Sequence, residues 1–169
     1  MKALNLGCGP WIFPNPPWIN ADILSNIAAD EVVDINEEWI WPANTFDQVW
    51  ANHVLEHAWD IKHVLHEIWR VCKPGAFVQI RLPICTWPEF WDDPTHHSHW
   101  TQQTLTWYQQ GHSHHGAQPF QDIEFEVRRQ ELRSEWELLW DLIVVKPGRA
   151  PVAETPISNP QQVAQGETL

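Results

Sequence analysis

Two short patterns within the first 22 residues could hold a ligand that resembles a nucleotide. An apolar run, Ala3-Leu4-Asn5-Leu6, ends in Gly7-Cys8-Gly9, and glycines at such a point let the backbone turn sharply and approach a ligand closely. Asp22 ends a second apolar run, where a carboxylate can accept hydrogen bonds from ribose hydroxyls. On its own, Gly-x-Gly also occurs in plain tight turns, so the assignment depends on the rest of the chain.

A second group of reactive side chains begins at residues 53–57, which read His-x-x-Glu-His. The same order occurs in the inverted zinc proteases, in which two histidines bind zinc and the glutamate is a general base. That chemistry needs a helix and a third ligand, whereas this motif starts at the end of a predicted strand. We therefore predict no metal at this motif.

Six of the ten histidines fall between residues 84 and 116. Imidazoles so crowded can bind a metal, carry protons near neutral pH or lie on a solvated loop, and the residue types leave these alternatives open. Where the chemistry needs a general base, the candidates are His57, Asp93 and His96.

The elements that would position these residues follow the pattern of a parallel sheet. Apolar runs predict strands at 3–6, 18–21, 31–34, 46–51 and 76–83. A helix is predicted from 61 to 71, because its apolar residues recur at helical spacing, Asp60 can cap it and Pro74-Gly75 follows it. Runs at 123–132 and 136–145 predict a closing antiparallel pair. The fold class is therefore α/β, with a mostly parallel sheet.

Two stretches depart from a regular alternation of strands and helices. Four of the eight residues from 10 to 17 are prolines, so the helix that would follow the first strand is predicted to be reduced or missing. Residues 84–116 are rich in loops, with a helix predicted at about 102–110, and loops of this length often serve as lids or binding segments.

Composition narrows the class of protein. The 169 residues carry a net charge of −12, which disfavours binding to nucleic acids and to anionic membranes. No apolar run is long enough to span a bilayer, and three cysteines without a paired spacing suit a reducing compartment, so we predict a cytoplasmic protein. Residues 1–146 are predicted to form one domain and residues 147–169 a disordered tail.

Four motifs in order resemble the S-adenosylmethionine-dependent methyltransferases with a Rossmann-like fold, and more narrowly methyltransferase type 11. They are Leu4-Asn5-Leu6-Gly7-Cys8-Gly9, Asn20-Ala21-Asp22, the run from Phe46 to His57, and Glu67 to Gly75. The resemblance spans about residues 3–83, and Asp93-Pro94-Thr95-His96 is similar to a segment of short bacterial members.

The resemblance implies S-adenosylmethionine as the cofactor and a small-molecule acceptor as the substrate. It places Gly7, Cys8 and Gly9 against the methionyl part of the cofactor and Asp22 on the ribose hydroxyls. It further places Asp34 and Ile35 beside the adenine, with Asn52 and His53 near the sulfonium. The family's loop normally feeds a helix, and here Pro10 follows at once.

An alternative function stays open on the sequence alone. The chain could keep the fold, and even the cofactor site, as a non-catalytic binding or assembly module. The thirteen tryptophans most simply fill or cover a small core. Together with the missing helix they also suggest apolar surface that a second copy of the chain or a different protein would cover.

Overall fold

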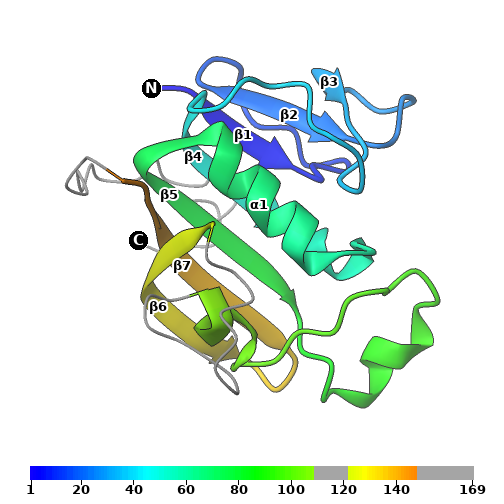
Figure 1. The fold of residues 1–169 in the computed structure, drawn as a ribbon. Coiled ribbons are helices and arrows are strands. Elements are labelled where there is room, and N and C mark those ends of the chain that lie inside the picture. Colours follow the sequence, from blue (N-terminus) through cyan, green and yellow to red (C-terminus); the bar gives the residue numbers. More distant parts are fainter. Residues whose placement is uncertain (109–121, 148–169) are drawn as a thin grey trace.

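The computed structural model describes residues 1–108 and 122–147. The strands of these residues form one mixed sheet (Figure 1). Its strand order is β3-β2-β1-β4-β5-β7-β6. The parallel strands are β1 (Ala3–Leu6), β2 (Trp18–Asp22), β3 (Glu31–Val32), β4 (Phe46–Asn52) and β5 (Cys72–Pro83). The antiparallel strands are β6 (Glu124–Arg133) and β7 (Glu137–Val145). The predicted sheet, with its closing pair, is confirmed.

The order of the strands reverses at β1, which pairs with β2 on one side and β4 on the other. At such a switch point the connections leave the sheet in opposite directions and open a crevice at the carboxyl ends of the strands. The Gly7–Gly9 turn leaves β1 there, Asp22 ends β2, and His53 follows β4. The topology therefore gathers the predicted site residues of three strands at one edge.

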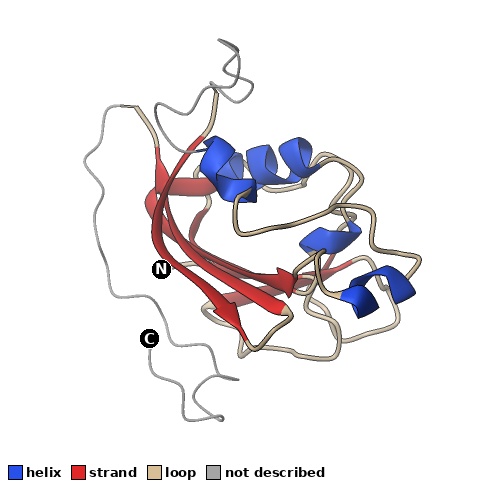
Figure 2. Cartoon of the chain, turned by 90° about the horizontal axis from the view of Figure 1, so that it is seen from below, coloured by secondary structure: helices blue, strands red, loops and turns tan. Residues whose placement is uncertain are grey.

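The single α-helix of the described residues, α1 (Ile61–Val71), follows its sequence signals closely. The Asp60 side chain accepts a hydrogen bond from the amide of Lys62 at 2.8 Å, as an N-cap residue does. The side chains of Val64, Leu65 and Ile68 are fully buried in the main core. Figure 2 shows the helices on one side of the sheet.

No helix joins β1 to β2, as the prolines predicted. The opposite face of the sheet is instead packed with a small aromatic cluster, in which Phe13 lies edge-on to Trp18 at 4.9 Å and Trp18 edge-on to Trp50 at 5.8 Å. These rings are almost completely buried. Large side chains from the loop and strands thus replace the missing helix, which explains part of the high tryptophan content.

The described residues after β5, 84–108, contain two 3₁₀ turns, η2 (Pro88–Asp92), which lies beyond the carboxyl end of β5, and η3 (Thr104–Tyr108) (Figure 1). The predicted helix at 102–110 is replaced over its described part by the short turn η3, and residues 109–110 lie outside the described range. A third turn, η1 (Leu55–His57), follows β4. Residues 148–169 of the predicted tail are also outside the described range. No helix of the described residues is long and apolar enough to cross a membrane.

Candidate functional site

A cavity of about 610 Å³ opens at the carboxyl ends of β1 to β4. This volume lies within the range of roughly 300–1,000 Å³ that is usual for small-molecule and cofactor sites. Residues at or after the ends of five strands, β1 to β5, contribute to its lining: Gly7, Gly9, Asp22, Ile23, Leu24, Val33, Asp34, Ile35, Asn36, His53, Val54, His57, Trp59, Thr95 and His97. Six of the eight predicted cofactor residues line this cavity, namely Gly7, Gly9, Asp22, Asp34, Ile35 and His53, whereas Cys8 and Asn52 do not.

Asp22 is held by the backbone of its own surroundings. One carboxylate oxygen accepts a hydrogen bond from the amide of Gly9 at 2.8 Å, and the other accepts from the amide of Leu24 at 3.0 Å. The residue is only 9% exposed, yet it lines the cavity. Since an ionised carboxylate has about four lone-pair sites, each oxygen can accept a further hydrogen bond from a ligand. Asp22 is thus an oriented acceptor of hydrogen bonds.

The two glycines of the first turn have different tasks. Both have positive φ, +63° at Gly7 and +50° at Gly9. A Cβ at Gly7 would lie 2.4 Å from side-chain atoms of Val54, so this glycine permits the loops after β1 and β4 to meet. A Cβ at Gly9 would meet nothing within 4 Å, so the cavity is open above that backbone.

Cys8, between them, faces the interior. It is 2% exposed, is absent from the cavity lining, and its amide donates to the carbonyl of Ala21 at 3.0 Å. Burial raises the pKa of its thiol to about 11, so the thiol stays protonated near neutral pH. The structure therefore places Cys8 behind the glycine loop, where it fastens the loop to β2.

The loop after β3 brings Asp34 and Ile35 to the cavity. The Asp34 carboxylate accepts hydrogen bonds from the backbone amide and side chain of Asn36, at 2.9 and 3.1 Å. Ile35 is buried below it, while Ile23 and Leu24 extend from the neighbouring loop with 59% and 51% of their surface exposed. Apolar walls with a few oriented polar groups are typical of a ligand site.

Asn52 and His53 end β4 in different environments. Asn52 is outside the cavity lining, and among the residues that the structure describes its buried side-chain oxygen has no hydrogen-bond partner. His53 lines the cavity, with positive φ and a ring nitrogen 2.9 Å from the Glu137 carboxylate. Hydrogen bonds to Glu137 and then Glu56 raise the pKa of His53 to about 9. His53 thereby links β4 to the start of β7.

The predicted bases His57 and Asp93 are connected through Thr95. Nδ1 of His57 lies 3.0 Å from both the carbonyl oxygen and the hydroxyl of Thr95. A carbonyl oxygen only accepts, so Nδ1 carries the proton and Nε2 keeps its lone pair. The Thr95 hydroxyl and amide both donate to Asp93, at 2.6 and 2.8 Å. These bonds lower the pKa of Asp93, which therefore remains a carboxylate.

His57 and Thr95 line the cavity, whereas Asp93 and His96 lie beside it. The His96 ring is 5.1 Å from that of His57 and its Nδ1 is 2.8 Å from the carbonyl oxygen of Phe90. The three predicted bases are therefore brought together, although only His57 reaches the cavity. The zinc-protease arrangement at 53–57 is not formed, because the segment is a strand end and a 3₁₀ turn, and His53 turns to Glu137.

Sequence reasoning missed several residues of the cavity wall, among them Trp59 and His97. Trp59 is 71% exposed and stacks on His97, with ring centroids 3.4 Å apart. The stack also borders a second hollow of about 430 Å³ near the start of α1. A histidine-rich segment was singled out from the sequence, but nothing in its residue types indicated which ring would meet Trp59.

Comparison with known proteins supports the family resemblance. Residues 25–80 match the family model described as a methyltransferase domain. No curated protein matches the chain. Because the family match lies within the region of the sequence motifs, the predicted resemblance is confirmed.

The fold matches solved methyltransferase structures at low sequence identity. A putative methyltransferase from Bacillus halodurans is 11% identical with a TM-score of 0.63, over 86% of this chain and 93% of that one. A SAM-dependent methyltransferase from Archaeoglobus fulgidus is 18% identical with a TM-score of 0.54, over 83% and 85%. A putative methyltransferase from Haloferax volcanii, solved with the Trm112 methyltransferase activator, is 14% identical with a TM-score of 0.60, over 86% and 83%. The predicted Rossmann-like fold class is confirmed.

The different surroundings of the two glycines give a testable contrast. We expect Gly7→Ala to lower the free energy of unfolding by about 1–3 kcal/mol more than Gly9→Ala, because only the first methyl group is forced against Val54. Both substitutions share the strain of positive φ, so Gly9→Ala is a matched control. Urea denaturation followed by tryptophan fluorescence measures the difference, and equal losses of stability would contradict the proposed contact.

Proposed function

We propose that this chain binds S-adenosylmethionine in the 610 Å³ cavity and methylates a small or modest-sized acceptor. Its fold is that of solved S-adenosylmethionine-dependent methyltransferases, and residues 25–80 match a methyltransferase domain. The observation that carries the proposal is the Asp22 carboxylate, fixed by the amides of Gly9 and Leu24 at the end of β2. The family model and the low-identity structures support the fold and the reaction class, and the acceptor follows from neither.

The lining residues suit the parts of this cofactor. Asp22 offers free lone pairs to the two ribose hydroxyls, which are neighbouring donors. Leu24, Val33 and Ile35 supply apolar contact for the adenine, and Asp34 stands at its edge. The open backbone at Gly9 leaves room for the methionyl chain. We expect His53, which lines the cavity after β4, to lie near the sulfonium of the cofactor.

One departure from the family changes how the methionyl carboxylate would be bound. Because no helix follows the first turn, the chain offers no helix N-terminus to this group. In the Gly7–Gly9 turn, the amides of Cys8 and Gly9 already donate to Ala21 and Asp22. His53, whose pKa is raised to about 9, is a cationic side chain that lines the cavity. We propose that the His53 ring takes the place of the helix.

S-adenosylmethionine supplies a methyl group that is already activated by a positively charged sulfur. The protein therefore has to align the acceptor with the methyl group and exclude water. Trp59 and His97 form a wall of the cavity suited to this task, since their stacked rings are large and rigid. A base is required only where the acceptor must lose a proton.

His57 is the residue that we assign as that base. Its Nδ1–H is occupied by Thr95, which leaves Nε2 free to accept a proton from an acceptor in the cavity. Asp93 acts through Thr95 as a positioning residue. His96, which does not line the cavity, packs beside the His57 ring.

A protein partner is a further part of the proposal. Ile23, Leu24 and Val32 are each more than half exposed at the β2–β3 side of the sheet, where the two-residue strand β3 leaves its edge open. The related Haloferax volcanii protein was solved with an activator protein. We expect a second copy or another protein to cover this apolar edge. A mass of only 19.8 kDa by light scattering at micromolar concentration would exclude a second copy of the chain as the partner.

The non-catalytic alternative makes a different prediction. A binding module needs no acceptor and tolerates loss of His57, whereas an enzyme requires transfer of the methyl group to a product. Incubating the purified chain and cell extract with methyl-labelled cofactor tests this point. Labelled product that depends on the chain supports the enzyme, and none across extracts from several sources supports the module.

Removing the Asp22 carboxylate tests the cofactor site directly. We expect Asp22→Ala to weaken binding of S-adenosylmethionine by about 1.5–3 kcal/mol, which is the size of lost hydrogen bonds to a charged group. Asp92→Ala removes an exposed carboxylate outside the cavity and serves as the control. Calorimetry gives the dissociation constants, and thermal melting shows that each variant is folded. Equal constants for Asp22→Ala and wild type would exclude Asp22 from the site.

Removing the proposed base should affect turnover more than binding. For an acceptor that loses a proton, we expect His57→Ala to lower kcat by roughly 10²-fold or more. The dissociation constant of the cofactor should stay within about threefold, and Asp93→Asn should lower kcat by a smaller factor, since it acts through Thr95. His66→Ala, an exposed imidazole on α1, is the control. Wild-type turnover in His57→Ala would contradict the assignment.

A further inference from the structure

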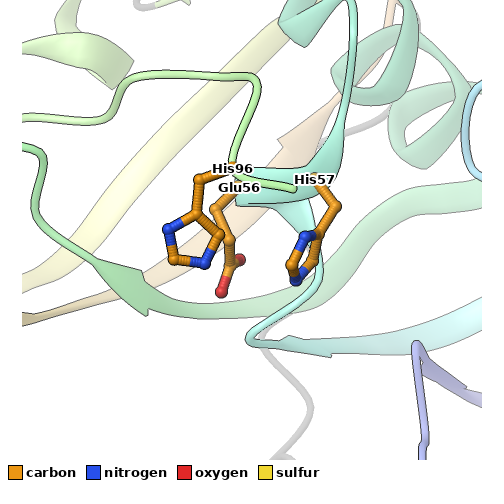
Figure 3. A group of neighbouring side chains, drawn as sticks. All are labelled: Glu56, His57 and His96. Atoms are coloured by element: carbon orange, nitrogen blue, oxygen red, sulfur yellow. The ribbon is translucent and has the colours of Figure 1, made fainter. Parts of the chain in front are cut away.

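Three side chains beside the cavity converge in a way that methyl transfer does not require. Glu56 and His57 lie on η1, and His96 lies on the segment that follows η2. Their potential ligand atoms all lie within 4.8 Å of one another. Figure 3 shows the carboxylate of Glu56 between the two imidazole rings. The sequence motif at 53–57 predicted no metal, but we propose that its Glu56 and His57, together with His96 in place of His53, bind one divalent transition-metal ion, with zinc as the best match.

The hydrogen bonds of the two rings prepare them as metal ligands. Nδ1 of His57 donates to the Thr95 carbonyl at 3.0 Å, and Nδ1 of His96 donates to the Phe90 carbonyl at 2.8 Å. Each ring is therefore held as the tautomer whose Nε2 has an available lone pair. A histidine that binds a metal commonly donates its other N–H to a backbone carbonyl in this way. Two neighbouring rings share the same arrangement.

The carboxylate of Glu56 gives an independent sign of a ligand site, because one of its two oxygens has no hydrogen-bond partner among the described residues. Glu56 is 1% exposed, and its Oε2 is buried without a hydrogen-bond partner among the described residues. Its other oxygen lies 3.6 Å from His53. A buried carboxylate oxygen without a partner is costly, and a bound cation would offset that cost.

Backbone hydrogen bonds hold the two parts of the cluster together. The Glu56 carbonyl accepts from the amides of His97 and Ser98 at 2.8 and 3.0 Å. The Ser98 hydroxyl donates to the carbonyl of Leu55 at 2.6 Å. His96 is thereby fixed opposite Glu56 and His57 before any metal arrives. A ligand set arranged in this way needs little rearrangement on binding.

The donor types indicate the class of metal. Two imidazole nitrogens and one carboxylate oxygen form a set found in catalytic zinc sites, which keep a fourth position for water or substrate. Atoms bound to one tetrahedral zinc are roughly 3.4 Å apart, so small side-chain movements would close this cluster. Asp93, whose second oxygen lies 3.7 Å from Nε2 of His96, adds negative charge beside it.

The metal site stands independently of the proposed cofactor site. Metal binding would occupy Nε2 of His57, the same atom that acts as base in the metal-free chain. The two assignments are therefore alternative uses of one nitrogen. Zinc titration without S-adenosylmethionine tests the metal site alone, so its failure leaves the methyltransferase proposal unaffected.

The experiment is a titration of the full chain with Zn²⁺ by calorimetry, together with the visible absorption spectrum of the Co²⁺-loaded protein. We expect one ion per chain at this cluster and cobalt bands of a four-coordinate site. Glu56→Gln and His96→Ala should each weaken binding by about 100-fold, since each removes a ligand. Zn²⁺ should raise the melting temperature of the wild type and leave that of Glu56→Gln unchanged.

Two controls separate this cluster from the other histidines. His66→Ala removes an exposed imidazole on α1, and the triple variant His112→Ala, His114→Ala, His115→Ala removes those outside the described residues. Both should bind Zn²⁺ like the wild type. The melting temperature of metal-free Glu56→Gln is the baseline for its Zn²⁺ response, because the substitution also removes the ion pair between Glu56 and His53. Unchanged binding in Glu56→Gln and His96→Ala, or loss of binding in the triple variant, would overturn the proposal.

Discussion

The hydrogen bond from the Gly9 amide to the Asp22 carboxylate is the interaction on which the site depends. It joins the turn after β1 to the end of β2 at 2.8 Å, in a fold whose first helix has been replaced by a loop rich in prolines. Without a helix to shape the turn, the carboxylate of the neighbouring strand orients its amide. The same carboxylate keeps lone pairs directed at the cavity. One interaction therefore both shapes the turn and presents the acceptor for a ribose.

The side of the site that would carry chemistry is built from a different contact. The segment containing Thr95 and His97 reaches the cavity because the amides of His97 and Ser98 bind the carbonyl of Glu56. This docking brings the Asp93–Thr95–His57 series of hydrogen bonds to the wall of the cavity. It also brings His96 to Glu56 and His57. The proposed general base and the proposed metal site therefore both depend on this contact between the loop after β5 and the Glu56 carbonyl.

Sequence patterns anticipated the sheet, the helix with its Asp60 cap and the missing first helix, because each has a local signal in apolar spacing or in proline. Several site features had no such signal. Cys8 faces the interior. Position 7 must be glycine because a Cβ there would overlap the side chain of Val54, which lies 47 positions away in the sequence. His96 lies close to Glu56 because the amides of the next two residues, His97 and Ser98, donate to the Glu56 carbonyl. Contacts of this kind follow from how loops pack, and residue types within either loop do not encode them.

Calorimetric titration of the wild-type chain with S-adenosylmethionine tests the central claim most directly. The account predicts saturable binding of one molecule per chain, which S-adenosylhomocysteine should displace, since it shares the ribose and adenine that Asp22 and Ile35 would contact. Crystals grown with the bound molecule should then show its ribose on Asp22. Absence of binding at millimolar cofactor by a folded chain, or a ribose located away from Asp22, would contradict the account.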